Sequence, residues 1–331
     1  EPQEVAAPQP VEPEPADEPE EPEEPPVPEP EEPYVRVIDP SKPMVALTFD
    51  DGPHDTWSNA ILDVLEENHA LATFFEVGQN VRAHPEPVQR MAELGCEIAS
   101  HSNAHKDLSK LKKKTLIKDL DTADAAFTDA GVEPPALVRP PYGAVNKNVK
   151  SATGRSIVTW TVDTEDWRSR DAQAVIDYVQ NYGDLDGEIV LMHSIYESTA
   201  DAVRVLVPWL QEQGYQLVTV TELLAYYYGE LPQPDRFYGY TYFSSHGRTD
   251  TPVPLPGETV PGAGVPAEEP AEEETPDTPA ALADEPEAPA ESESPAEEAP
   301  AETDKEWKPV RVPDTVDLAP ASIPNPALFM P

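Results

Sequence analysis

The sequence predicts an α/β fold around a parallel sheet, and we expect that sheet to close, or nearly close, into a barrel. Strand-like and helix-like segments alternate about seven times between residues 43 and 230. The strand-like segments are almost wholly apolar, which is typical of parallel strands that are buried on both faces. A doubly wound open sheet is the alternative, although a barrel fits a domain of this length better.

The segments outside this domain have a different composition. Residues 1–42 hold 14 acidic residues and 13 prolines against two basic residues, and residues 247–331 hold 20 acidic against four basic residues. Such segments cannot bury enough apolar surface to offset chain entropy, so we expect 1–42 to be a disordered spacer and 247–331 a disordered tail. Residues 231–246 form an aromatic extension that we expect to pack on the barrel; stacking against sugars is the alternative.

The apolar run Met44–Leu47 predicts the first strand, and Gly52-Pro53 turns the chain after it. Val45, Leu47 and Phe49 would share one face of this strand. Further strands are expected at 72–77, 96–99, 136–139, 156–162, 188–193 and 216–220. Helices are expected at 56–67, 85–94, 115–130, 146–153, 172 onward, 199–213 and from 221.

Several helix ends carry recognisable capping residues. Thr56 and Asp171 are the expected N-caps of two helices, because their side-chain oxygens can accept bonds from free N–H groups of the first turn. Gly95, Gly131 and Gly214 follow three other helices, where glycine accommodates the left-handed conformation that closes a helix.

Composition excludes several classes of function. A net charge of −42 leaves no basic stripe to replace counterions, so we expect no nucleic-acid partner. Lys110 and Lys112–Lys114 form a basic cluster that we interpret as a solvated helix start, with contact to an anionic polymer as the alternative. Cys96 is the single cysteine, which excludes an intrachain disulfide and a thiolate metal site, and we expect it in the core.

The sequence also bears on localisation. No stretch is apolar enough to span a membrane. The first residue is Glu1 rather than Met, so we expect that a targeting segment is absent from this sequence. A Pro/Glu-rich spacer suits an extracellular protein or one tethered to a cell wall or surface.

Polar side chains follow five of the predicted strands. These groups are Asp50/Asp51, His101/His105, Arg139/Tyr142, Asp163/Asp166/Trp167 and His193. In an α/β barrel the carboxyl ends of the strands meet at one face, where chemistry gathers. On its own Asp50-Asp51-Gly52-Pro53 is ordinary turn chemistry, but a carboxylate with two histidines offers three N/O ligands and an open position, as a catalytic zinc site requires.

These groups resemble the five motifs of the polysaccharide deacetylases (carbohydrate esterase family 4, the NodB homology domain). The matching segments, in the family's order, are Thr48–Pro53, His101–His105, Arg139–Tyr142, Asp163–Trp167 and Leu191–His193. The resemblance covers roughly residues 43–228, so it identifies 43–230 as the catalytic domain. It also implies a distorted barrel of seven or eight strand–helix units.

The resemblance implies a metal centre and a base. Asp51, His101 and His105 would hold a divalent metal, usually zinc or cobalt in this family. Asp50 would be the general base that accepts a proton from water. Arg139 would pair with Asp50 and orient it.

It also implies an acid, an oxyanion donor and a pocket. His193 would be the general acid, with Asp166 orienting its ring. The backbone N–H of Tyr142 would stabilise the oxyanion, and Trp167 and Leu191 would shape the pocket for the acetyl methyl group. The alternatives are purely structural roles: Arg139 and Asp166 would form an ion pair, and Trp167 and Leu191 would be core residues.

The expected function is that of a metal-dependent hydrolase removing N-acetyl groups from an extracellular glycan. The expected partner is an acetylated glycan, with N-acetylglucosamine in peptidoglycan or chitin oligomers favoured, and the expected state is a monomer. Both acidic residues of the first motif are present, which favours a glucosamine-type substrate, whereas Ser194 replaces the Asp that many members have after the last His. The alternatives are an O-deacetylase, as in acetyl xylan esterases, and a non-catalytic wall-binding module.

Overall fold

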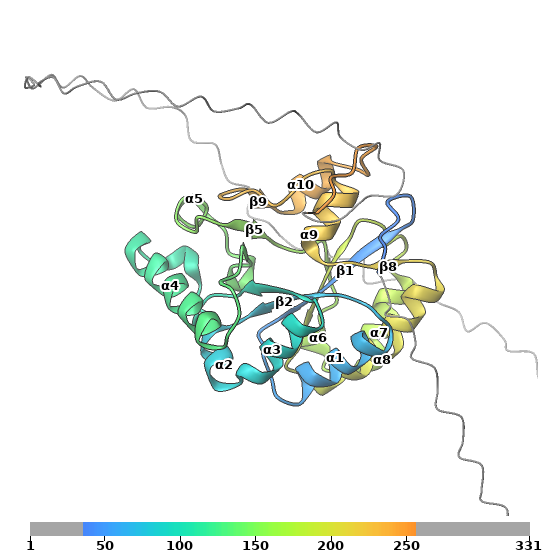
Figure 1. Ribbon diagram of the computed structural model, residues 1–331, viewed down its shortest axis with the longest axis horizontal. Helices are drawn as coiled ribbons and strands as arrows, with labels where there is room; N and C mark the ends of the chain where they lie inside the picture. Colours follow the sequence, from blue (N-terminus) through green and yellow to red (C-terminus); the bar gives the residue numbers. More distant parts are fainter. Residues whose placement is uncertain (1–35, 256–331) are drawn as a thin grey trace, which may run out of the picture. The chain divides into compact units, whose positions relative to one another are not determined.

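The computed structural model describes residues 36–255 (Figure 1). Residues 1–35 of the predicted spacer and residues 256–331 of the predicted tail lie outside the described residues. No helix among residues 36–255 is long and apolar enough to cross a membrane.

One parallel sheet forms the centre of the fold, as the sequence predicts. Its strands are β1 (Met44–Asp50), β2 (Thr73–Glu76), β3 (Glu97–Ser100), β4 (Leu137–Val138), β5 (Ser156–Val158), β6 (Val162–Asp163), β7 (Ile189–His193), β8 (Gln216–Leu217) and β9 (Phe237–Tyr238). They are ordered β6-β7-β1-β2-β3-β4-β5-β9, with β8 also paired to β1, and every pair is parallel.

Helices connect these strands and surround the sheet (Figure 1). They are α1 (Trp57–Glu67), α2 (Gly78–Ala83), α3 (Pro85–Glu93), α4 (Lys113–Asp129), α5 (Lys147–Lys150), α6 (Asp166–Ser169), α7 (Ala172–Asn181), α8 (Glu197–Glu212), α9 (Val220–Glu222) and α10 (Tyr240–Ser245). Shorter turns are η1 (Leu108–Lys110), η2 (Pro141–Gly143) and the π-helical η3 (Leu223–Tyr227).

The sheet curls because two of its distant strands are almost contiguous in the chain. Strands β5 and β6 lie near opposite ends of the strand order, yet only residues 159–161 separate them. Three residues span about 10 Å, so the two ends must approach each other, as in a distorted barrel. The prediction of one strand over 156–162 is therefore wrong. Arg139 explains the break, since its Nε and Nη2 donate to the carbonyls of Val158 and Thr159 (3.4 and 3.3 Å).

The two faces of β1 pack into separate cores. Val45, Leu47 and Phe49 pack with residues of α1, α7 and α8 on the outer side of the sheet. Met44 and Ala46 face a second cluster formed with the end of the described chain, notably η3, β9 and α10. Further along that second face lie Thr48 and Asp50, both buried, so the apolar core gives way to polar groups toward the carboxyl ends of the strands.

Packing contacts continue past both ends of residues 43–246, the part predicted as the domain and its packed aromatic extension. Arg36 pairs with Glu222 and donates to the Leu217 carbonyl (2.7 Å), and Ile38 is buried in the second core cluster. Residues 36–42, which the sequence analysis assigns to the spacer, therefore include residues that pack on the domain. At the other end, the aromatic extension contributes β9 to the sheet edge, and Arg248 pairs with Asp186 (2.6 Å).

The start of α1, next to the Asp50-Asp51 turn, differs from its prediction. Thr56 makes no side-chain capping bond. Instead Nδ1 of His54 accepts from the N–H groups of Thr56 and Trp57, both at 3.2 Å. A histidine therefore satisfies the free donors that the predicted threonine was expected to satisfy.

Candidate active site

The carboxyl ends of neighbouring strands bring the candidate residues together. Asp50 and His193 are the last residues of β1 and β7 and lie opposite each other in the sheet. His101 and Arg139 come directly after β3 and β4, and Asp166 opens α6 shortly after β6. The strands from β6 through β1 to β4 are consecutive neighbours, so their ends form one continuous rim.

Three side chains at this rim converge like metal ligands. Atoms of Asp51, His101 and His105 lie within 4.8 Å of one another. Oδ1 of Asp51 is 3.1 Å from Nε2 of His105 and 3.5 Å from Nε2 of His101, yet it makes no well-directed hydrogen bond. Lone pairs that converge in this way favour a cation at their centre. The trio thus fits a divalent metal with two nitrogen ligands and one oxygen ligand.

A backbone contact fixes which nitrogen of His101 faces the trio. Nδ1 of this buried ring is 2.7 Å from the carbonyl oxygen of Arg139. A carbonyl only accepts, so Nδ1 carries the proton and Nε2 presents its lone pair toward Asp51. Burial lowers the pKa of His101, which keeps the ring neutral, as a metal ligand must be.

The other two members of the trio influence each other. Burial would raise the pKa of Asp51, but the neighbouring His105 and His101 outweigh it and lower that pKa. Asp51 in turn raises the pKa of His105. The carboxylate is therefore held in its charged form, the form that binds a metal.

The backbone of the site is unusual. Five of its non-glycine residues adopt left-handed φ angles between 49° and 71°, namely Asp51, Ser102, His105, Tyr142 and Glu165. Such angles are uncommon outside glycine and cluster at functional sites. Side chains alternate between the two faces of a strand, and the left-handed conformation of Asp51 interrupts this alternation. The side chains of Asp50 and Asp51 can therefore both face His101.

A buried ion pair lies beside the trio. Nη1 of Arg139 donates to Oδ1 of Asp50 (2.7 Å) and to the hydroxyl of Thr48 (2.9 Å). The Arg139 guanidinium also stacks on Phe75, 3.9 Å from the ring centre. Oδ2 of Asp50 remains on the side of the trio, 3.7 Å from Nε2 of His101.

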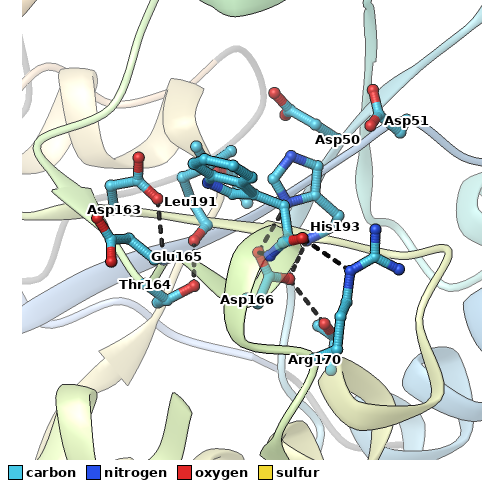
Figure 2. Close-up of polar contacts among 12 residues, drawn as sticks. Asp50, Asp51, Asp163, Thr164, Glu165, Asp166, Arg170, Leu191 and His193 are labelled. Carbon is cyan, nitrogen blue, oxygen red and sulfur yellow. Dashed lines mark hydrogen bonds and ion pairs between the residues drawn. The ribbon is translucent and has the colours of Figure 1, made fainter. Parts of the chain in front are cut away.

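A second pair joins His193 to Asp166 (Figure 2). Nδ1 of His193 lies 2.7 Å from Oδ1 of the fully buried Asp166. Burial alone would lower the pKa of His193, but the hydrogen bond and the charge of Asp166 raise it. Figure 2 shows the His193 ring between Asp166 on one side and Asp50 and Asp51 on the other. The alternative that Arg139 and Asp166 pair with each other is wrong, since each pairs with another residue.

Thr199 completes the surroundings of Asp166, and the sequence did not reveal it. Its hydroxyl donates to Oδ2 of Asp166 (2.7 Å), which also accepts from the N–H of His193 (2.8 Å). Oδ1 of Asp166 accepts from the N–H of Trp167 (2.8 Å). Four contacts therefore hold this carboxylate. Thr199 lies in the first turn of α8, where no pattern in the sequence distinguishes it.

The three remaining candidates lie at different depths. Leu191 is buried (3 % exposed) in β7, whereas Trp167 is 46 % exposed at the rim. The alternative that both are plain core residues is therefore wrong for Trp167. Tyr142 is 66 % exposed, and its ring meets His105 edge-on with centroids 4.8 Å apart.

A groove of about 550 Å³ borders this rim. Its lining includes Arg170, Tyr196 and the start of α8. The Arg170 guanidinium stacks on the Tyr196 ring at 3.3 Å, and that ring lies 5.8 Å from the ring of His193. No pattern in the sequence indicated this groove.

A buried carboxyl group next to the turn that follows β1 was also unexpected. Glu76 ends β2, is fully buried, and neither of its carboxyl oxygens has a hydrogen-bond partner within the protein. Burial and the charges of Asp50 and Asp51 raise its pKa well above the ordinary value of 4.5. A Cβ atom on Gly52 would lie 2.6 Å from Oε2 of Glu76 and 2.4 Å from Oγ of Ser194, so only glycine fits there.

The family comparison agrees with this fold and rim. Residues 38–158 match the family model for polysaccharide deacetylases. A peptidoglycan-N-acetylglucosamine deacetylase of Bacillus cereus is 34% identical over 191 residues, which cover 55% of this chain and 89% of that protein. The chain belongs to the polysaccharide deacetylase family, a family of hydrolytic deacetylases.

Two longer relatives are more similar in sequence. The peptidoglycan-N-acetylmuramic acid deacetylase PdaC of Bacillus subtilis is 41% identical over 192 residues, 58% of this chain. The peptidoglycan-N-acetylglucosamine deacetylase PgdA of Listeria monocytogenes is 42% identical over 195 residues, 59% of this chain. The match spans about two fifths of the length of each relative, 41% in both cases.

Solved structures share the fold. The structure of PdaC aligns with a TM-score of 0.56 at 39% identity, covering 57% of this chain and 93% of that one. A family 4 acetyl xylan esterase from Clostridium thermocellum, in complex with a cobalt ion, aligns with a TM-score of 0.54 at 30% identity, covering 59% of this chain and 97% of that one.

Proposed function

We propose that this protein is a metal-dependent hydrolase that removes N-acetyl groups from N-acetylglucosamine residues of peptidoglycan and releases acetate. One observation carries the proposal: an Asp50–Arg139 pair and a His193–Asp166 pair both adjoin the metal-ligand trio. Amide hydrolysis needs a base on the attacking side and an acid on the leaving side, and the two pairs supply one group each.

Asp50 is the proposed base. Arg139 holds Oδ1, so Oδ2 is the oxygen left to accept a proton from the attacking water. The buried guanidinium keeps the carboxylate oriented and compensates its charge. The attack adds the water oxygen to the acetyl carbonyl carbon, and the backbone N–H of Tyr142 would donate to the resulting oxyanion.

His193 is the proposed acid. Nδ1 is engaged with Asp166, so Nε2 is the atom that faces the substrate and delivers the proton. The C–N bond breaks as the sugar nitrogen takes that proton, which leaves acetate and a free amine. Trp167 and Leu191 would enclose the acetyl methyl group, one from the exposed rim and one from within β7.

Asp51, His101 and His105 are the proposed ligands of a divalent metal, with zinc favoured and cobalt as the alternative. A metal there would polarise the carbonyl of the acetyl group and lower the pKa of water. The converging lone pairs and the tautomer of His101 support this assignment. All the proposed residues come from one chain, so the reaction needs no second copy.

The choice of polymer draws on the relatives and on the first motif. Relatives are named for N-acetylglucosamine, for N-acetylmuramic acid and for chitooligosaccharides. We favour glucosamine residues of peptidoglycan because both acidic residues of the first motif are present. A substrate of this kind would place the protein outside the cell or at the cell wall.

Acetate release from a panel of acetylated glycans tests the proposal. We expect the zinc-loaded protein to release acetate from peptidoglycan and chitooligosaccharides, and little from acetylated xylan. Preferential release from xylan would indicate an O-deacetylase, and no release from any glycan would contradict enzymatic activity.

The variant Asp50→Asn tests the assignment of the base. An amide keeps the shape of the side chain but cannot accept the proton, so kcat should fall at least about 100-fold, within the usual range for general base catalysis. Glycan binding should persist. Asp63→Asn, which changes an exposed carboxylate on α1, is the matched control and should leave kcat unchanged.

A further inference from the structure

Eight of the nine lysines between residues 36 and 255 lie in two short segments. We call them the lysine patch: Lys106, Lys110, Lys112, Lys113, Lys114, Lys118, Lys147 and Lys150. All eight are exposed. The first six surround η1 and the start of α4, and the last two belong to α5.

Hydrogen bonds hold the two segments side by side. Nδ2 of Asn146 donates to the Ser109 carbonyl and Nδ2 of Asn148 to the Leu111 carbonyl, both at 2.9 Å. Nζ of Lys113 donates to the Ser151 carbonyl at 3.1 Å. The helix α5 therefore lies against η1 and α4, and Figure 1 shows α5 beside α4. The exposed lysines of the two segments are thus brought close to one another.

This surface contrasts with the rest of the chain. Asp107 is the single acidic residue in 106–118 and 144–155, and it pairs with Lys110 (2.8 Å). The whole chain carries a net charge of −42. Because salt screens charges beyond about 8–10 Å, an approaching anion responds to the local lysines more than to distant carboxylates.

The patch adjoins the proposed active site. Lys106 follows His105 in the chain, and His105 contacts the ring of Tyr142. The Tyr142 hydroxyl donates to the backbone carbonyl of His105 at 3.5 Å, directly beside Lys106 in the chain. A polymer bound across the metal-ligand trio and leaving past Tyr142 would therefore run over the lysines.

We propose that the lysine patch binds the carboxylates of an acidic glycan strand and so favours peptidoglycan over neutral chitin as the substrate. This inference rests on the proposed function. Muramic acid residues carry a lactyl group whose carboxylate is free or extended by a peptide, so negative charge recurs along a peptidoglycan strand. Chitin carries none. Clustered cations raise the local concentration of such a strand and hold it in place.

The double variant Lys112→Gln/Lys114→Gln tests the proposal. Among the described residues, neither ammonium group makes a hydrogen bond or an ion pair that the change would break, whereas Lys113 does. The matched control is Lys42→Gln/Arg204→Gln, which removes the same charge from exposed sites elsewhere. Arg204 loses only an exposed pair with Asp201, which contributes little to stability.

Steady-state acetate release is measured with soluble peptidoglycan fragments and with chitooligosaccharides of equal sugar length. At low salt we expect the patch variant to raise KM for peptidoglycan about three- to tenfold, with kcat unchanged and with no effect on chitooligosaccharides. At roughly 0.5 M salt the variant and the wild type should converge. The control variant should match the wild type throughout.

An equal change on both substrates, or no change in KM, would overturn the proposal. A lower KM in the patch variant would also overturn it. That result would mean that the acidic segments of the same chain occupy the lysines in the wild type and hinder the substrate. Cosedimentation of the full-length protein with insoluble peptidoglycan in chelator gives a readout that needs no activity. If the wild type released no acetate from either glycan, the proposed function would fail, and cosedimentation alone would decide whether the patch binds.

Discussion

Among single residues, Glu76 has the least expected environment. A fully buried carboxyl group without a hydrogen-bond partner within the protein is costly in its charged form. Burial and the charges of Asp50 and Asp51 raise the pKa of Glu76 and so favour its neutral, protonated form. In that form Glu76 adds no negative charge next to Asp50 and Asp51.

Replacing Glu76 with Gln should change how stability depends on pH. The folded-state pKa lies above the ordinary value of 4.5, so folding favours the protonated form, and this contribution is lost as pH rises through the folded pKa. The amide cannot ionise. We expect the free energy of unfolding of Glu76→Gln to exceed that of the wild type by a margin that grows as the pH rises above the ordinary pKa of 4.5.

Urea unfolding of the metal-free proteins at several pH values measures that margin. Glu67→Gln, an exposed carboxylate at the end of α1, is the control and should follow the wild type. Parallel curves for Glu76→Gln and the wild type would show that Glu76 ionises as freely in the folded protein as in the unfolded chain.

Replacing Thr199 should impair the proposed acid without removing it. Thr199→Val keeps the shape of the side chain but deletes the hydroxyl that donates to Asp166. Hydrogen bonds to charged groups contribute about 1.5–3 kcal/mol, so we expect kcat to fall about tenfold or more. Thr199→Ser retains the donor and should keep most of the activity. Equal kcat values for the valine and serine variants would exclude this role of Thr199.

Among the elements, β9 shows that the end of the described chain belongs to the fold. It pairs with β5, and the neighbouring Tyr242 and Phe243 of α10 lie in the second core cluster. Backbone bonds continue the contact beyond α10, from the N–H of Thr249 to the Tyr227 carbonyl (2.7 Å) and from that of Val253 to the Ala225 carbonyl (3.0 Å).

Truncation should therefore be tolerated at residue 255 but not at residue 230. A protein of residues 36–255 should unfold cooperatively, like the full chain. A protein of residues 36–230 loses β9 and exposes the edge of β5 together with an apolar surface, so we expect it to aggregate or to lack a cooperative transition. Thermal unfolding followed by circular dichroism compares the two. An equally cooperative transition in the shorter protein would place the domain boundary at 230 after all.

For the whole molecule, a bound metal should stabilise the folded state. The trio draws on the turn after β1 and the loop after β3, which lie far apart in the unfolded chain. A ligand that binds only the folded protein adds about 2.7 kcal/mol at 100 times its Kd. We expect zinc to raise the Tm of the wild type, and a chelator to abolish acetate release until zinc or cobalt is restored.

The control for this effect is a change of one proposed ligand. His105→Ala removes an imidazole that is only partly buried, so the metal-free variant should unfold at nearly the same temperature as the metal-free wild type. Its Tm should not respond to zinc. A zinc response equal to that of the wild type would remove His105 from the proposed ligand set.

The sequence alone predicted the class of fold, because buried parallel strands leave near-continuous apolar runs and the helices between them keep a helical period. It also indicated the groups that gather at the rim, since in this architecture polar residues just after strands must share one face. The broken strand over 156–162, the extra strand β9 and the packing of residues 36–42 were decided by contacts distant in sequence, such as those of Arg139 and Arg36.

At the site, the sequence marked Asp50 and Asp51 as neighbours but gave no geometry for them. The left-handed backbone at Asp51, the tautomer of His101 and the support of Asp166 by Thr199 all depend on partners brought in by other strands. The amino-acid sequence shows which residue types are present and how far apart they are along the chain. Which atoms face each other, and which carboxyl group has a raised pKa, follows only once burial and neighbouring charges are fixed in three dimensions.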